Sequence, residues 1–112
     1  MFNKFEESIP ERFSWEMMGG KCHAVWLSGK HANVGYRFEL GYILHGDRPT
    51  SVFGTFEIIE AEAENLGSFI QNHWAEAGFA SEDEAVSYYE MEFCRHEFFV
   101  TDGYTYKFRR VK

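Results

Sequence analysis

The sequence contains few of the residues that would restrict its fold or cellular compartment on their own. It has two cysteines and two prolines in 112 residues, and it has no run of about 18 consecutive apolar residues. Two distant thiols make no disulfide framework, so we expect reduced cysteines and a cytoplasmic protein. Met1 to Pro10 lacks the basic and apolar regions of a signal peptide, and nothing predicts a membrane span.

Motifs of high catalytic specificity are also missing. The glycines are scattered and precede no Lys-Ser or Lys-Thr pair, so no phosphate-binding loop is predicted. The sequence has no nucleophile elbow and no His-Glu-x-x-His. It therefore favours a protein without enzymatic activity and predicts no cofactor.

Lysine and arginine are absent from Pro49 to Cys94, although this stretch carries ten Asp or Glu. Residues 1 to 48 hold six acids and six bases, and residues 95 to 112 hold two acids and five bases. The net charge of −7 argues against direct binding to nucleic acid, whose phosphates require a basic surface. A basic partner is the simpler expectation.

The composition indicates one folded domain over residues 1–112. The chain is 45% hydrophobic and 19% aromatic, which excludes a disordered tail. Alternating patterns predict strands near 12–17, 21–28, 34–45 and 52–59, and short links between them favour an antiparallel meander. Gly19 and Gly20 are expected to form the first hairpin turn.

Two helices and a final hairpin complete the predicted fold. Apolar residues recur at helical spacing from Glu60 to Gly78, and Ser81 with Glu84 matches a capping box that starts a short helix ending near Glu90. Asp102-Gly103 is expected to join strands at 91–101 and 104–111. The fold class is thus α+β: an antiparallel sheet of about five to six strands, packed by one main helix and a short second helix.

The leading functional hypothesis is an acidic, aromatic surface that binds a basic protein. Tyr88 and Tyr89 are consecutive, so one of them should be exposed beside carboxylates, where a ring can stack on a partner's guanidinium. The proposed binding residues are Glu76, Glu82, Asp83, Glu84, Tyr88, Glu90 and Glu92. The alternative interpretation gives these acids no binding role: they only form a solvated surface that keeps the protein soluble.

The expected partner is a nucleic-acid-binding protein complex, because clustered carboxylates imitate the charge spacing of phosphates. Inhibitors of CRISPR complexes from phages and mobile elements are one analogy, and immunity proteins that neutralise toxins are another. A homodimer, with the basic end of the chain from Lys107 to Lys112 against the acidic stretch of a second copy, stays open.

The alternative is a small-ligand protein or enzyme with a pocket between sheet and main helix. Its lining would comprise Trp26, Tyr36, His73 and Trp74. Its reactive or zinc-binding groups would come from Cys94 and His96, together with Cys22 or His23. The spacing of these four residues matches no established metal motif, so the interaction hypothesis is preferred.

Overall fold

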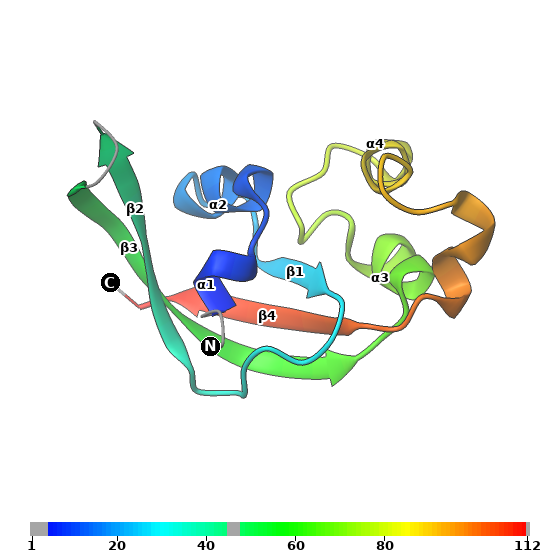
Figure 1. Ribbon diagram of the computed structural model, residues 1–112, viewed down its shortest axis with the longest axis horizontal. Coiled ribbons are helices and arrows are strands. Elements are labelled where there is room, and N and C mark those ends of the chain that lie inside the picture. The colour runs from blue at the N-terminus through cyan, green and yellow to red at the C-terminus, as the bar shows by residue number, and fades with distance from the viewer. Residues whose placement is uncertain (1–4, 45–47, 112) are drawn as a thin grey trace.

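The computed structural model describes residues 5–44 and 48–111, and it places helices on one face of an antiparallel sheet (Figure 1). The α+β class predicted from the sequence is confirmed. The strands are β1 (Ala24–Leu27), β2 (Arg37–Leu44), β3 (Arg48–Ala63) and β4 (Tyr104–Arg110). Their order across the sheet is β1-β4-β3-β2.

This order differs from the expected meander, because the last strand lies in the middle of the sheet. β2 and β3 form the predicted antiparallel pair, whereas β1 pairs with β4, with Val25 opposite Tyr106. Over the described residues the sheet has four strands, and the predicted total of five to six is not confirmed. The first strand of the chain therefore joins the sheet by pairing with the last strand.

The segment expected to form the first strand is helical. After α1 (Phe5–Ser8), α2 spans Glu11–Met18, so the strand prediction for 12–17 was wrong. Phe13 and Met17 are buried four residues apart on one face, while Trp15 is 45% exposed. Alternation over five residues was mistaken for a strand because every fourth position also belongs to one face of a helix.

The two glycines after α2 end that helix rather than turn a hairpin. Gly20 has φ +78°, and its N–H donates to the Met17 carbonyl at 3.1 Å. The Lys21 N–H donates to the Glu16 carbonyl at 2.8 Å. This hydrogen-bond pair is a Schellman motif, in which the residue after the C-cap takes the left-handed conformation that glycine adopts without strain.

The predicted main helix is shorter and starts later than expected. β3 continues through Ala63, and α3 spans Leu66–His73. Asn65 caps α3, because its Oδ1 accepts from the Ser68 N–H at 2.8 Å. The helix prediction for residues 60–65 was therefore wrong, since Glu60 to Ala63 pair with β4.

The second helix is confirmed as α4 (Glu82–Tyr89), but the terminal hairpin is not. Residues Arg95–Val100 form a short 3₁₀ helix, η1, where a strand was predicted. Gly103 instead lies buried against the indole of Trp26 at the start of β4. α3, α4 and η1 thus connect β3 to β4 and gather at one end of the sheet (Figure 1).

Aromatic rings fill the core between sheet and helices. The Phe5 ring lies 5.0 Å from that of Phe38 and 4.9 Å from that of Tyr106. The Tyr106 hydroxyl accepts from the His31 N–H at 2.7 Å, which ties the segment after β1 to β4. Val34, the first residue of the strand predicted over 34–45, precedes β2 and is 61% exposed.

Candidate functional site

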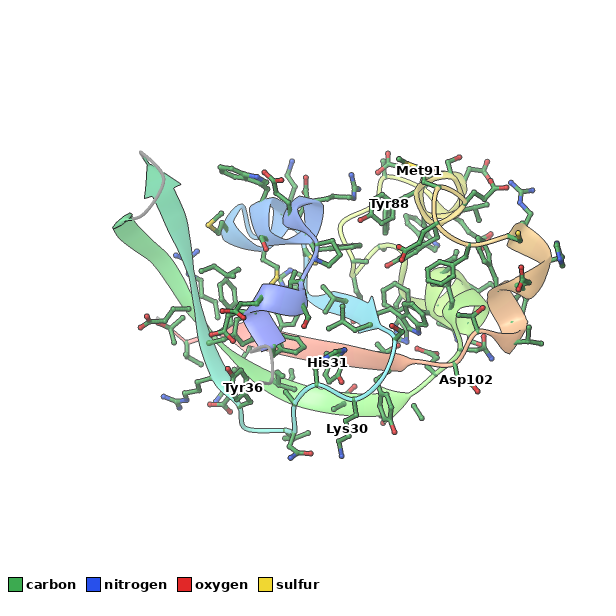
Figure 2. The ribbon with its side chains drawn as sticks, viewed as in Figure 1. Lys30, His31, Tyr36, Tyr88, Met91 and Asp102 are labelled. Carbon is green, nitrogen blue, oxygen red and sulfur yellow. The ribbon has the colours of Figure 1, made fainter. Side chains whose placement is uncertain are left out.

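The acidic residues singled out by the sequence fall into two places in the fold. Five of them, together with Tyr88, lie on α4 or in the turn after it, where Tyr88 and Met91 are labelled (Figure 2). These six are Glu82, Asp83, Glu84, Tyr88, Glu90 and Glu92. Glu76 lies before α4, against the sheet. Five of the proposed acids thus lie on α4 or just after it, and Glu76 lies apart from them.

The start of α4 explains part of this charge. The Ser81 Oγ accepts from the Glu84 N–H at 3.1 Å, as the capping box predicted. The Glu84 carboxylate reaches back to the Ala80 N–H at 3.4 Å, one residue earlier than expected. Carboxylates in the first helical turn are stabilised by the positive end of the helix dipole. Capping therefore accounts for Glu84.

On one side of α4, Arg12 of α2 occupies the place expected for a partner's guanidinium. Its Nη2 lies 2.8 Å from the Glu84 Oε1, and its guanidinium carbon lies 4.3 Å from the Phe79 ring centre and 5.6 Å from that of Tyr88. Tyr88 also packs edge-on against Phe13 at 5.5 Å. Glu84 and the Arg12-facing side of Tyr88 are thus engaged within the chain.

On the other side, Arg95 of η1 pairs with Glu90. Arg95 Nη2 donates to Glu90 Oε1 at 2.8 Å, and Arg95 Nε donates to Glu90 Oε2 at 3.2 Å. An exposed pair of this kind contributes little to stability, because water and salt screen it. It nevertheless removes Glu90 from the set of free carboxylates.

Glu76 belongs to a polar network at the junction of β3, α3 and β4. Its Oε1 lies 2.8 Å from His73 Nδ1, and its Oε2 lies 3.5 Å from Lys107 Nζ. His73 Nε2 lies 3.3 Å from Glu64 Oε1, so each ring nitrogen faces a carboxylate. Desolvation alone would raise the pKa of Glu76, but the His73 hydrogen bond and the Lys107 charge together hold that pKa below its usual value.

Bases outside the acidic stretch therefore neutralise several of its members. Lys107 also lies 3.6 Å from Glu60, and Arg109 lies 3.5 Å from Glu57, so the basic end of the chain contacts its own β3. Within the described part of the chain, three carboxylates of the proposed surface form no ion pair within 4 Å. They are Glu82, Asp83 and Glu92.

Glu82 and Asp83 border a groove of about 290 Å³ between α3, α4 and η1. Its apolar walls come from all three elements. They are Ile70, Val86, Phe98 and Phe99. Phe99 is 54% exposed, and Val100 beside it is exposed as well.

Sequence reasoning missed Phe99 because residues 91–101 were assigned to a strand. The signal was present, since Phe98 and Phe99 are consecutive and one of two consecutive residues must point away from the core. Phe98 is buried and Phe99 is exposed.

Comparison of the chain with protein-family models, with curated proteins and with solved structures finds no match. The site must therefore be interpreted from its own geometry.

The alternative pocket of the sequence analysis does not form as expected. The Trp26 indole N–H donates to the Glu64 carbonyl at 2.9 Å, and the Tyr36 hydroxyl donates to Glu6 at 2.7 Å. Tyr36 borders a different hollow from Trp26, and no described hollow contains His73 or Trp74 in its lining. Trp26 and Tyr36 therefore lie at different hollows among those described.

The two cysteines occupy opposite environments. The Cys22 thiol is buried, lies 3.3 Å from the Ala24 carbonyl oxygen, and has its pKa raised to about 12 by burial. Cys94 is exposed. Across residues 5–44 and 48–111, no group of three or more His, Cys, Asp or Glu side chains is arranged to hold a metal ion. In the same ranges, no helix has the length and apolar character to cross a bilayer.

Proposed function

We propose that this protein is a non-enzymatic binding protein that holds a basic segment of a partner in the groove between α3, α4 and η1. The observation that carries the proposal is the pair of carboxylates, Glu82 and Asp83, beside the half-exposed ring of Phe99. Neither carboxylate has a basic partner within 4 Å among the described residues. Arg95 also lines the groove, where it pairs with Glu90, so the groove combines an aromatic wall with two carboxylates that this arginine does not pair.

An arginine side chain suits this combination best. Its guanidinium stacks on an aromatic face while pairing with carboxylates at its edge. The chain already makes such an arrangement internally, where Arg12 lies over Phe79 and pairs with Glu84. The groove offers the same chemistry from outside, with Phe99 in place of Phe79 and Asp83 in place of Glu84.

The net charge of −7 supports the same partner class, because it accelerates encounter with a positive surface and repels nucleic acid. We propose a nucleic-acid-binding protein as the partner, since such proteins carry the arginine-rich surfaces that the groove would recognise. Occupying that surface would regulate or inhibit the partner. The candidate contact residues are now Glu82, Asp83 and Phe99.

The test uses a fluorescently labelled nona-arginine peptide and measures its anisotropy at low and moderate salt. Reversal of both carboxylates, Glu82→Lys with Asp83→Lys, should weaken binding at least tenfold, equal to about 1.4 kcal/mol. Phe99→Ala should weaken it by several fold without changing the salt dependence. Circular dichroism checks that each variant remains folded.

The matched control is Glu7→Lys with Glu39→Lys, because these exposed carboxylates lie on α1 and β2 and give the same change in net charge. This control should lose only a few-fold of affinity through the weaker overall field. Equal losses of peptide affinity in the two double variants would show that net charge alone, and not the groove, determines binding. Unchanged binding after the groove reversal would refute the proposal.

A further inference from the structure

A second cavity lies beside the C-terminal part of α4 and shares no lining residue with the groove. It has a volume of about 200 Å³ and opens between α4, β1 and the segments that flank β1 and precede α2. Tyr88 on α4 and His31 after β1 border it (Figure 2). Four of its lining side chains are aromatic: Trp26, Tyr88, Tyr89 and Phe93.

These rings stand at right angles to one another. The Trp26 ring lies 5.9 Å from that of Phe93 at 87° and 6.3 Å from that of Tyr89 at 85°. Tyr88 and Tyr89 are 5.0 Å apart at 89°. We call these four side chains the aromatic box. In each perpendicular pair the edge of one ring lies against the face of the other, and the faces that stay uncovered carry the negative part of the quadrupole. The cavity is therefore built from surfaces that attract a cation.

The charge at this cavity has the same sign. Glu92 and His31 line it, and neither Lys nor Arg is among its described lining residues. Arg12 lies over the Tyr88 ring from outside this lining. Glu92 forms no ion pair within 4 Å with any other described residue, so its carboxylate is available to an occupant. An anionic ligand would be repelled by both the rings and the carboxylate.

We propose that this aromatic box binds a methylated ammonium group. Methylation spreads the positive charge over an apolar sphere, which enters an aromatic cavity with less loss of hydration than a bare ammonium. A cavity of about 200 Å³ accepts a group of four or five heavy atoms, together with the start of its carrier chain. A carrier protein's methylated lysine and a choline headgroup share this chemistry.

The box and the groove are separate sites, because they share no lining residue. The inference does not rest on the proposed function. A small cation without arginine tests the box, and the arginine peptide tests the groove. A negative result for the box does not affect the proposal for the groove, and a negative result for the groove does not affect the proposal for the box.

The experiment titrates the protein with tetramethylammonium chloride and follows the Trp26 indole N–H by ¹H–¹⁵N NMR. We expect a saturable shift with a Kd on the order of 1 mM, which is usual for so small a ligand. The uncharged analogue 3,3-dimethylbutanol has the same shape as choline without its charge. It should bind at least tenfold more weakly than choline.

Variants identify the box as the site. Glu92→Gln keeps the shape of an exposed side chain and should weaken choline binding by about threefold to tenfold. Phe93→Leu should weaken it by about tenfold, whereas Glu82→Gln on the groove should leave it unchanged. Trimethyl-lysine and phosphocholine then show which carrier the surroundings of the box prefer.

Two results would overturn the proposal. Equal binding of choline and its uncharged analogue would show a merely apolar hollow. The absence of any shift at about 50 mM tetramethylammonium, far above the expected Kd, would show that no cation enters. Both readouts use the unmodified protein and stand even if Phe93→Leu fails to fold.

Discussion

Replacing Gly103 by alanine tests the packing between β1 and the start of β4. A Cβ atom at this position would lie 2.4 Å from two ring carbons of Trp26 and 2.7 Å from the Leu27 carbonyl oxygen. The indole cannot swing away into solvent, because Trp26 is 4% exposed. Its N–H also donates to the Glu64 carbonyl at 2.9 Å. The variant must move β4 or displace the indole from this hydrogen bond.

The expected decrease in the free energy of unfolding is the sum of an overpacking cost and one lost hydrogen bond. Overpacking of a filled core costs about 1–3 kcal/mol, and a lost hydrogen bond adds about 1 kcal/mol. We expect Gly103→Ala to lower the free energy of unfolding by about 2–4 kcal/mol. With about 4 °C per kcal/mol for a domain of roughly this size, the Tm should fall by about 8–16 °C.

Gly67→Ala is the matched control, because it creates a similar clash beside a mobile ring. Its Cβ would lie 2.7 Å from the Phe99 ring, which is half exposed and free to rotate outward. Alanine also favours the helical backbone of α3 over glycine by up to about 1 kcal/mol. This variant should remain within about 1 kcal/mol of the parent protein.

Urea unfolding followed by far-ultraviolet circular dichroism measures both variants. A loss below about 0.5 kcal/mol for Gly103→Ala would refute the close packing of Trp26 against this glycine, since that lies within the usual effect of a surface change. Equal losses in the two variants would refute the distinction between a trapped and an exposed ring.

Two further predictions concern titration and thiol chemistry. Because the pKa of Glu76 is lowered in the folded protein, its ionised form stabilises the fold above the unfolded value of about 4.5, and this contribution is lost as the pH falls through the lowered pKa. The difference in the free energy of unfolding between the parent protein and Glu76→Gln should thus shrink from neutral pH to about pH 3. Urea unfolding midpoints at each pH measure this difference, and a difference that stays constant with pH would contradict the prediction. In a thiol-reagent assay, exposed Cys94 should react in the native protein and buried Cys22 only after unfolding, and Cys94→Ser should abolish the native reaction.

Local sequence chemistry predicted the elements whose signals are complete within a few residues. Ser81 followed by Glu84 fixed the start of α4 correctly, because the capping hydrogen bond needs only those neighbours. The paired strands β2 and β3 were also found, since alternation and a turn-rich composition between them define a hairpin.

The first misassignment arose where two periodicities coincide. Phe13 and Met17 fit both a strand and a helix, and Trp15 between them suggested alternation. Pro10 followed by Glu11 distinguishes the two. Proline is favoured at the position just before a helix or at its first residue, and an acid is favoured in the first helical turn. Placing this helix correctly would also have placed Arg12 near α4.

The sheet order required information that no local pattern carries. β1 pairs with β4 across almost the whole length of the chain, so its partner depends on which surfaces the helices leave for it. Residues 95–100 illustrate the same limit. They are rich in aromatic and β-branched residues typical of strands, but they form η1, where only Phe98 is buried.

The candidate site changed for a related reason: charge segregated along the sequence is not segregated in space. Arg12 and Arg95 lie outside the stretch from Pro49 to Cys94, yet each pairs with an acid of α4 or its C-cap. Counting acids and bases along the chain therefore overstated the free negative charge of the surface. The charge available to a partner is set by the carboxylates that the protein's own arginines and lysines leave unpaired.

The carboxylates that stay free at the groove are those whose isolation costs the fold least. Glu82 and Asp83 occupy the first turn of α4, where the helix dipole stabilises negative charge without a counter-ion. Arg95 lines the same groove and its charge acts on Asp83, but it pairs with Glu90 and forms no ion pair within 4 Å with Glu82 or Asp83. Neutralising them by Glu82→Gln and Asp83→Asn should consequently lower stability by only about 1 kcal/mol while removing the charge that the proposed binding requires.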